Sequence, residues 1–528
     1  MLVATGIFLS RIAGLVRQRV FAHYFGDTLY ADAFNAANRI PNYLQNLFGE
    51  GVLSASFIPV YSKLLAQGNE EEAGRTAGAV GAILALITSV LVVIGILAAP
   101  VLTTLIAPGF QGEKRDLTIV LVRILFPGVG VLVFGAWALG ILNSHRKFLL
   151  SYTAPVLWNA AIIFTLIFFG RATFAHGAPA VTEHNAALSH LAVLTMWGSV
   201  VGCVLQFLVQ LPTVLKIAPH LHFALDWARD SVRHVIRNFG PVFAARGVVQ
   251  ISAFIDSMLA SWLGNGAVAA LNYAQIIYML PISLFGMSVS AAELPAMSSS
   301  IGDEAVVHAQ LRQRLTYGLR QIAFFVVPSA IAFLALGDVI VGALYQTGRF
   351  HHGDTLFVWG ILAGSAVGLL AGTLGRLFSS AYYALRDTRT PLKFAVVRVT
   401  LTLALGVLFA FPLPRWIGID PRWGVAGLTA SAGVAGWVEF LLLRRTLERR
   451  IGHADFGFSY VARLWSAAVV SAAIAWLVKL GIAHATRAHV HPAVAAVIIL
   501  LPYGAAYFAL TTAMGISNAK QLLARFRR

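Results

Sequence analysis

Long apolar stretches recur along this chain of 528 residues, and short polar segments separate them. An α-helix needs about 20 apolar residues to cross the hydrocarbon core of a bilayer. Windows of that length predict an all-α polytopic membrane protein with about 14 transmembrane helices. The expected helices lie near residues 2–22, 29–61, 76–105, 117–142, 150–170, 187–213, 236–262, 267–297, 316–345, 354–384, 391–411, 423–443, 459–483 and 491–514.

The composition supports this fold class. Hydrophobic residues make up 58% of the chain and charged residues 12%, whereas about 25% of the residues in a typical soluble domain are charged. The net charge of +17 comes largely from Lys and Arg in the short segments between apolar stretches, a pattern that orients membrane proteins. With both termini in the cytoplasm, the cytoplasmic loops hold about 22 basic residues against about 8 outside. The charge therefore predicts an orientation in a membrane, and no nucleic acid partner is expected.

Motifs of common enzyme classes are missing from the sequence. The single cysteine, Cys203, excludes an intrachain disulfide and any CxxC metal or redox site. The chain also lacks the Walker A, HExxH and GxSxG patterns. We therefore expect no enzyme, no cofactor and no metal centre built on such motifs.

The most informative polar residues lie between residues 10 and 59, within sequence that is otherwise apolar. A charged side chain at the bilayer centre costs at least ~2.5–3.5 kcal/mol, so such residues indicate a functional site. Arg11 and Arg17 lie on the first expected helix. Polar residues on the second recur in steps of three and four, which places them on one helix face: Asp32, Asn35, Arg39, Asn42 and Asn46. Basic groups outnumber acidic ones, so the pattern predicts a watered cationic pocket that binds an anion. The alternative is that these charges pair and only lock helices together.

The chain also repeats itself at an offset of roughly 235–240 residues. The matching segments include Phe48-Gly49 with Phe285-Gly286, Arg11 with Arg246, and residues 105–110 with 344–350. Two copies in the same orientation form a parallel repeat, which in transporters places the binding site at the interface of the copies. We expect an N-terminal lobe of six helices (1–220), a C-terminal lobe of six helices (221–450), and two extra helices with a basic cytoplasmic tail (451–528).

Several short motifs combine along the chain. They are Ser10-Arg11 with Gly14 and Arg17, Phe25-Gly26, Ala31-Asp32-Ala33-Phe34, Pro41-Asn42, Phe48-Gly49-Glu50-Gly51, Ala107-Pro108-Gly109-Phe110, and Arg386-Asp387 with Thr390-Pro391. With these motifs the chain resembles the MviN/MurJ family of lipid II flippases, within the multidrug/oligosaccharidyl-lipid/polysaccharide exporter superfamily. The resemblance implies a two-lobed transporter in the bacterial inner membrane that moves the lipid-linked peptidoglycan precursor outward for cell wall synthesis.

The resemblance also implies which residues meet the substrate. Arg11, Arg17 and Asp32 match positions of the family's cavity. Arg39 matches a basic position, and Arg376 sits where relatives carry a basic residue. Lipid II carries a diphosphate, and guanidinium groups bind diphosphates well because they stay charged and offer paired donors.

Two positions depart from the family pattern. Gln45 and Ile276 stand where well-studied relatives carry arginine, so the resemblance leaves open how the second lobe holds the diphosphate. Our hypothesis is that Arg246, the repeat counterpart of Arg11, supplies the missing charge. Asn42, on the polar face of the second helix, is a candidate to hydrogen-bond the sugar or the peptide, with packing between helices as its alternative.

Asp256 matches a residue that binds sodium in some relatives. The eleventh expected helix offers only Thr402 and Gly406 where further oxygen ligands would be needed, which argues against a sodium site here. The alternative is an ion pair of Asp256 with Arg246 or Arg398.

These observations predict a lipid II flippase that is not an enzyme. Its expected partners are lipid II, membrane lipids and other proteins of cell wall synthesis. Two alternatives stay open: an exporter of another polyprenyl-diphosphate oligosaccharide or of a drug, and a non-transporting membrane scaffold.

Overall fold

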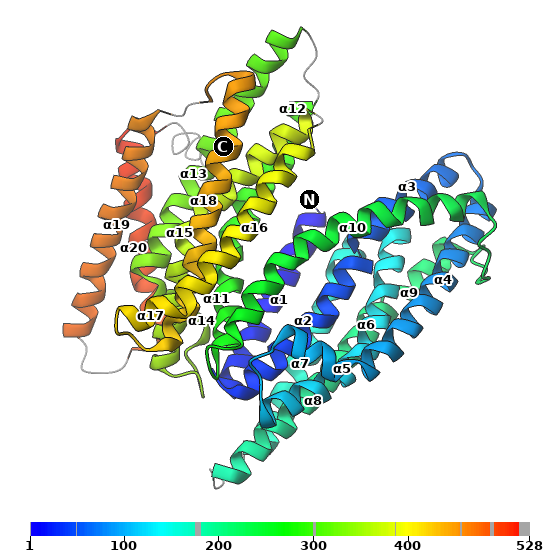
Figure 1. Ribbon diagram of the computed structural model, residues 1–528, viewed down its shortest axis with the longest axis horizontal. Helices are drawn as coiled ribbons and strands as arrows, with labels where there is room; N and C mark the ends of the chain where they lie inside the picture. The colour runs from blue at the N-terminus through cyan, green and yellow to red at the C-terminus, as the bar shows by residue number, and fades with distance from the viewer. Residues whose placement is uncertain are drawn as a thin grey trace. The chain divides into compact units, whose positions relative to one another are not determined.

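The computed structural model describes residues 2–48, 50–174, 181–298, 303–385, 387–454, 457–485 and 490–516, and within them it contains helices and no strand. Figure 1 shows their course from the N-terminus in blue to the C-terminus in red. The helices are α1 (Leu2–Phe25), α2 (Leu29–Phe48), α3 (Glu50–Ala66), α4 (Glu70–Leu97), α5 (Ala99–Ile106), α6 (Gly112–Ser144), α7 (Phe148–Phe174), α8 (Val181–Leu208), α9 (Leu211–Ile217), α10 (Asp230–Ala260), α11 (Ala267–Pro281), the π-helix η1 (Ile282–Met287), α12 (Ser288–Ser298), α13 (Glu304–Ala335), α14 (Gly337–Tyr345), α15 (His352–Ala384), α16 (Arg389–Ala410), α17 (Pro412–Trp416), the 3₁₀-helix η2 (Pro421–Trp423), α18 (Gly424–Ile451), α19 (Phe458–Ala485) and α20 (Pro492–Ala513).

The all-α membrane fold expected from the sequence is confirmed. Each predicted window coincides with one helix or with consecutive helices. Within the described residues, 11 helical segments are long and apolar enough to cross a membrane. The windows outside that set are 2–22, 29–61 and 236–262, which carry the charges singled out above. The count of 14 spans therefore stays a prediction.

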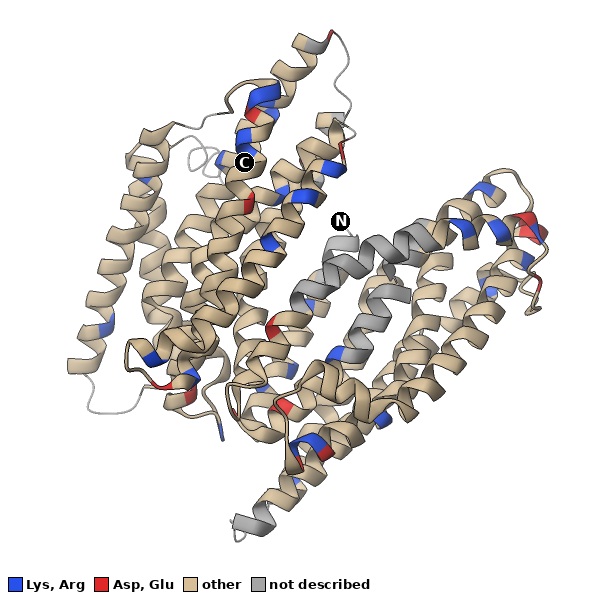
Figure 2. Cartoon of the chain, in the orientation of Figure 1, with Lys and Arg blue, Asp and Glu red and all other residues tan. Residues whose placement is uncertain are grey.

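Charged residues are sparse along the helices. Figure 2 shows long stretches of helix without any charged residue, and many of the charges lie near helix ends. This distribution fits helices that keep their charges in the interfacial water. The few charges farther inside a helix therefore need an explanation of their own.

Contacts divide the chain into two compact units. Unit 1 comprises Met1–Ala269 together with Thr347–Phe350, and unit 2 comprises Ala270–Gln346 with His351–Arg528. Helix α10 belongs to unit 1 because it packs on α2 and α3. The lobe boundaries predicted from the repeat, 1–220 and 221–450, stay a prediction.

The core of unit 1 includes a cluster of large side chains from α3, α4 and α6. Trp137 is almost fully buried and donates its indole N–H to the Ala77 carbonyl at 3.0 Å. Phe57 and Tyr61 stack with their ring centroids 5.2 Å apart. A buried indole with its one donor satisfied adds packing area without a polar penalty.

In unit 2 the C-terminal helices dock on α13 and α14. Tyr503 and Tyr507 of α20 donate to the carbonyls of Pro328 and Phe324, each at 2.7 Å. Lys479 of α19 is paired with an aspartate of α14. These side chains hold the two extra helices to one face of unit 2.

Helices α15 and α18 of unit 2 approach closely through glycine. A Cβ on Gly433 would lie 2.7 Å from the Gly368 nitrogen and 3.1 Å from the Val367 Cβ. Small residues at such crossings let helix backbones pack in a membrane. The indole of Trp437, one turn farther along α18, donates to the Val367 carbonyl at 2.8 Å.

We predict that Gly433→Ala destabilises unit 2 by about 1–3 kcal/mol, because the added methyl group forces α15 and α18 apart. Gly436→Ala on the same helix is the control, since nothing lies within 4 Å of its added Cβ. The control should be neutral or slightly stabilising. Thermal unfolding of the detergent-solubilised protein measures both, and equal melting temperatures would contradict the packing argument.

Candidate functional site

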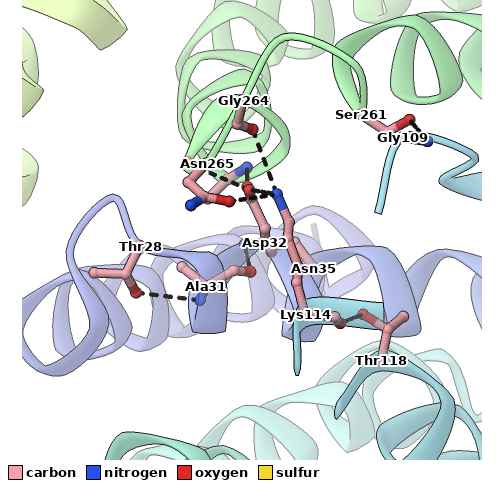
Figure 3. A network of polar contacts seen from close by, with 12 residues as sticks. Thr28, Ala31, Asp32, Asn35, Gly109, Lys114, Thr118, Ser261, Gly264 and Asn265 are labelled. Atoms are coloured by element: carbon pink, nitrogen blue, oxygen red, sulfur yellow. Dashed lines mark hydrogen bonds and ion pairs between the residues drawn. The ribbon is translucent and has the colours of Figure 1, made fainter. Parts of the chain in front are cut away.

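Asp32, in the first turn of α2, lies at the centre of a buried polar network (Figure 3). Its side chain has no solvent exposure. The backbone N–H groups of Gly266 and Ala269 donate to its two carboxylate oxygens at 2.7 Å each, and the Lys114 ammonium is in contact with it. These donors offset part of the cost of removing the carboxylate from water.

The network joins three parts of unit 1. Asp32 comes from α2, Lys114 from the start of α6, and the two backbone donors from the start of α11. The first N–H groups of a helix have no partner inside the helix, and a negative charge there also interacts favourably with the helix dipole. Asp32 therefore fixes the position at which α11 begins.

Lys114 is 7% exposed. Its ammonium also lies 3.4 Å from both the Gly264 carbonyl and the Asn265 side-chain oxygen, and 4.0 Å from the Phe110 ring centroid. An ammonium offers three donors and favours the face of an aromatic ring. The surroundings of Lys114 therefore compensate its charge from several sides.

The sequence reasoning missed Lys114. Gln111, Gly112 and Glu113 precede it and read as an ordinary polar loop, and local spacing does not mark one lysine as buried. The signal available was indirect, because a buried aspartate requires a cation. The sequence reasoning placed Asp32 in the family's cavity without naming a partner for it, and here its charged partner is Lys114.

The predicted arginines of α1 differ in their surroundings. The Arg17 guanidinium carbon lies 4.6 Å from the centroid of the Trp158 ring on α7, a cation–π distance. The Trp158 indole donates in turn to Ser199 of α8 at 3.0 Å. Arg11 is exposed. Arg17 therefore packs against an aromatic ring, whereas Arg11 is exposed.

The polar face of α2 is only partly described. Asn35 is buried and donates to the Ala31 carbonyl at 2.9 Å, and Arg39 is half-buried. The side chains of Asn42 and Arg246 lie outside the described residues, so their predicted roles stay predictions.

The remaining predicted positions lie on α10 and α15. Asp256 is half-buried in unit 1, and Arg376 is exposed in unit 2. Arg398, proposed above as a partner of Asp256, pairs with Glu439 at 3.4 Å. Among the described residues, no group of three or more His, Cys, Asp or Glu side chains lies together as a metal site.

Two glycine loops make matching contacts within unit 1. The Gly109 N–H donates to the Ser261 hydroxyl at 3.0 Å, and the Arg349 N–H donates to the His23 carbonyl at 3.0 Å. A Cβ on Gly109 would collide with Ser261, and one on Gly348 would collide with His23. Residues 107–110 and 347–350 belong to segments that the internal repeat relates, so we call these the two loop contacts.

Comparisons with known proteins place the chain in a family. A family model described as lipid II flippase MurJ matches residues 21–502. The chain belongs to this family. The lipid II flippase MurJ of Burkholderia cenocepacia is 32% identical over 448 residues, which cover 84% of this chain and 82% of that protein. A probable lipid II flippase MurJ of Rhizobium tropici is 30% identical over 475 residues, covering 89% and 84%. The family resemblance seen in the sequence motifs is confirmed.

Solved structures show the same fold. A lipid II flippase MurJ in an inward closed conformation matches with a TM-score of 0.77 at 22% identity, over 97% of this chain and 98% of that chain. An inward-facing multidrug resistance transporter of the MATE family, from the MOP superfamily, matches with a TM-score of 0.65 at 19% identity, over 82% and 95%.

One motif of the resemblance forms a compact loop between α15 and α16. Asp387 accepts hydrogen bonds from the Thr390 N–H at 3.0 Å and the Thr390 hydroxyl at 2.8 Å. Arg450 of α18 donates to it at 2.7 Å. The hydrogen bonds from Thr390, and then the Arg450 guanidinium, lower the pKa of Asp387 to about 2.

We predict that Lys114→Met destabilises unit 1 by about 3–5 kcal/mol, because it leaves a buried carboxylate without its cation. The double variant Asp32→Asn with Lys114→Met should be more stable than Lys114→Met alone, since it removes the uncompensated charge. Arg75→Gln is the control, because its pair with Glu71 is exposed and contributes below about 1 kcal/mol. A double variant no more stable than Lys114→Met, in thermal unfolding, would count against the network.

We also predict a pH dependence from Asp387. Its folded-state pKa lies below the ordinary aspartate value of about 3.9, so its ionised form stabilises the fold above about pH 4, and this contribution is lost as the pH falls towards 2. Melting temperatures measured down this range should fall less steeply for Asp387→Asn than for the unmodified protein. The exposed Asp116→Asn on α6 should leave the slope unchanged. Parallel curves for Asp387→Asn and the unmodified protein would rule out the effect.

Proposed function

We propose that this protein is a lipid II flippase of the bacterial inner membrane. It moves the undecaprenyl-diphosphate-linked peptidoglycan precursor from the cytoplasmic to the outer leaflet by alternating access, and it acts as a transporter and not as an enzyme. The observation that carries the proposal is the family match over residues 21–502. The charged residues within α1, α2 and α10 supply the chemistry that this substrate needs.

The substrate's diphosphate would be held by guanidinium groups. They stay ionised and bind oxyanions through paired donors. We assign substrate contact to Arg11, Arg17, Arg39, Asn42, Arg246 and Arg376, and to Asp32 when the network around it opens. The exposure of Arg11 and Arg376 supports this assignment, since a charged group that is open within a spanning helix needs water or an anion beside it.

The proposed layout follows the repeat. Residues 1–220 and 221–450 form the two lobes that rock about the site, and residues 451–528 add two helices and a cytoplasmic tail. Both termini lie in the cytoplasm. An inside-negative potential then favours outward movement of the anionic substrate, by about 2.3 kcal/mol per charge and 100 mV. The partners are lipid II, the surrounding lipids and other proteins of cell wall synthesis.

In this orientation the Asp32 network and the two loop contacts lie on the outer side. They join the ends of α1 and α10 and the start of α11 within unit 1. Outward release of a large headgroup requires these contacts to open. The network is therefore the outer closure of the transport cycle.

We predict that the protein restores growth of a strain depleted of its own lipid II flippase, and that Arg11→Ala and Arg17→Ala abolish the rescue, because each removes a cation from the diphosphate site. Arg75→Ala, at an exposed position of α4, should rescue fully. Growth is compared at equal membrane levels of each variant. A well-inserted unmodified protein that fails to rescue would contradict the proposed function.

A second prediction concerns the outer closure. Gly348 and Gly418 have φ values of 58° and 71°, so an alanine strains both, yet only Gly348 meets a neighbour. Gly348→Ala should therefore favour the open state and expose Val268, a fully buried residue of α11. Maleimide labelling of Val268→Cys measures this, since the native Cys203 is buried.

Labelling should be about tenfold faster with Gly348→Ala than with Gly418→Ala, which corresponds to roughly 1.4 kcal/mol. Equal labelling rates in the two backgrounds would show that the loop contact does not hold the closure.

A further inference from the structure

Unit 2 contains a second group of charged residues on spanning helices. Arg376 lies on α15, Arg398 on α16 and Glu439 on α18, and Arg376 lies within electrostatic range of the other two. Helix α18 packs on both α15 and α16. With two guanidinium groups and one carboxylate, the group carries one positive charge in excess.

Each of the three residues lies at least two turns inside its helix. Arg376 is eight residues before the end of α15, and Arg398 is nine residues after the start of α16, which is about 12–14 Å at the helical rise per residue. Glu439 lies 12 residues before the end of α18. At this distance from the helix ends, snorkelling to the interface does not by itself account for a charge.

The open face of α15 around Arg376 is suited to water. Arg376, Ser379 and Tyr383 follow one another at helical spacing, and each is exposed or half-buried. The Tyr278 hydroxyl lies 3.9 Å from where a Cβ of Gly372 would be, one turn before Arg376. Among the described residues, the Arg376 guanidinium donates no hydrogen bond, so its five N–H donors are available.

The Arg398–Glu439 pair is loose. Its contact from Nε to a carboxylate oxygen measures 3.4 Å, whereas charge-assisted hydrogen bonds measure about 2.7–2.9 Å. The Arg398 side chain is 39% exposed. A guanidinium held this weakly exchanges its partner at little cost.

We propose that Arg376 and Arg398 form a second anion-binding position, for a diphosphate, and that Glu439 stays paired with Arg398 until the anion binds. The incoming diphosphate displaces the Glu439 carboxylate and takes the donors of both arginines. This gives the second lobe cations, where Ile276 stands in place of an arginine of the relatives. The inference rests on the proposed function for the source of the diphosphate.

The two partners of the ion pair should affect binding in opposite directions. Arg398→Gln removes donors and should weaken binding of farnesyl diphosphate at least about tenfold. Glu439→Gln removes the competing carboxylate and should tighten binding severalfold. A pair that only locks α16 to α18 predicts the same direction for both variants, through loss of stability.

The test measures farnesyl diphosphate binding to the purified full-length protein by calorimetry, with farnesol and inorganic pyrophosphate as comparison probes. Farnesol should not bind, and pyrophosphate shows whether the prenyl chain is needed. Arg445→Gln, which removes an exposed cation from the end of α18, is the matched control and should bind as the unmodified protein does.

Unchanged binding by Arg398→Gln, or weaker binding by Glu439→Gln, would overturn the second anion position. If Arg398→Gln does not fold, Glu439→Gln alone decides, since tighter binding supports the exchange and unchanged or weaker binding overturns it. The growth-rescue experiment separates the two proposals. If the protein rescues growth while all its variants bind alike, only the second anion position is contradicted. If it binds as described but does not rescue growth, only the flippase assignment is contradicted.

Discussion

The cost of removing charge from water is the constraint on which this structure depends. An ion buried without a partner is unfavourable by several kilocalories per mole, so each charge away from bulk water requires a partner, bound water or a ligand. Asp32 meets the requirement with Lys114 and two backbone N–H groups. That arrangement holds the first residues of α11, up to Ala269, against α2 and α6 within unit 1. The same requirement supports our proposal that the exposed Arg11 and Arg376 contact an anionic ligand.

Much of the fold follows from local patterns in the sequence, because hydrophobic length and helical spacing act over short distances. The helical windows and the polar face of α2 follow from them, and the family was recognised from the resemblance of short motifs. The partners of the charges do not. Lys114 lies 82 residues from Asp32, and Glu439 lies on a different helix from Arg398. Pairings of this kind depend on how helices pack, and a polar residue at a loop edge gives no sign of its burial.

The internal repeat is visible in two glycine loops but not in the arrangement of the charges. Segments 107–110 and 347–350 each place a glycine against a backbone carbonyl, where no side chain fits. The charges do not follow the repeat so closely: one group is closed by a buried lysine and backbone donors, and the other is a looser pair with a guanidinium beside it. The proposed transport cycle assigns a different role to each: the buried network of unit 1 closes the outer side, and the looser pair of unit 2 exchanges its partner for an anion.

The most direct test of lipid II transport uses the purified protein in liposomes. Lipid II with a labelled headgroup is placed in the leaflet that corresponds to the cytoplasm, and its appearance in the opposite leaflet is followed with a membrane-impermeant reagent. The predicted result is translocation well above that of protein-free liposomes, faster with an inside-negative potential. Translocation equal to that of protein-free liposomes, from protein shown to be folded and inserted, would contradict the flippase assignment.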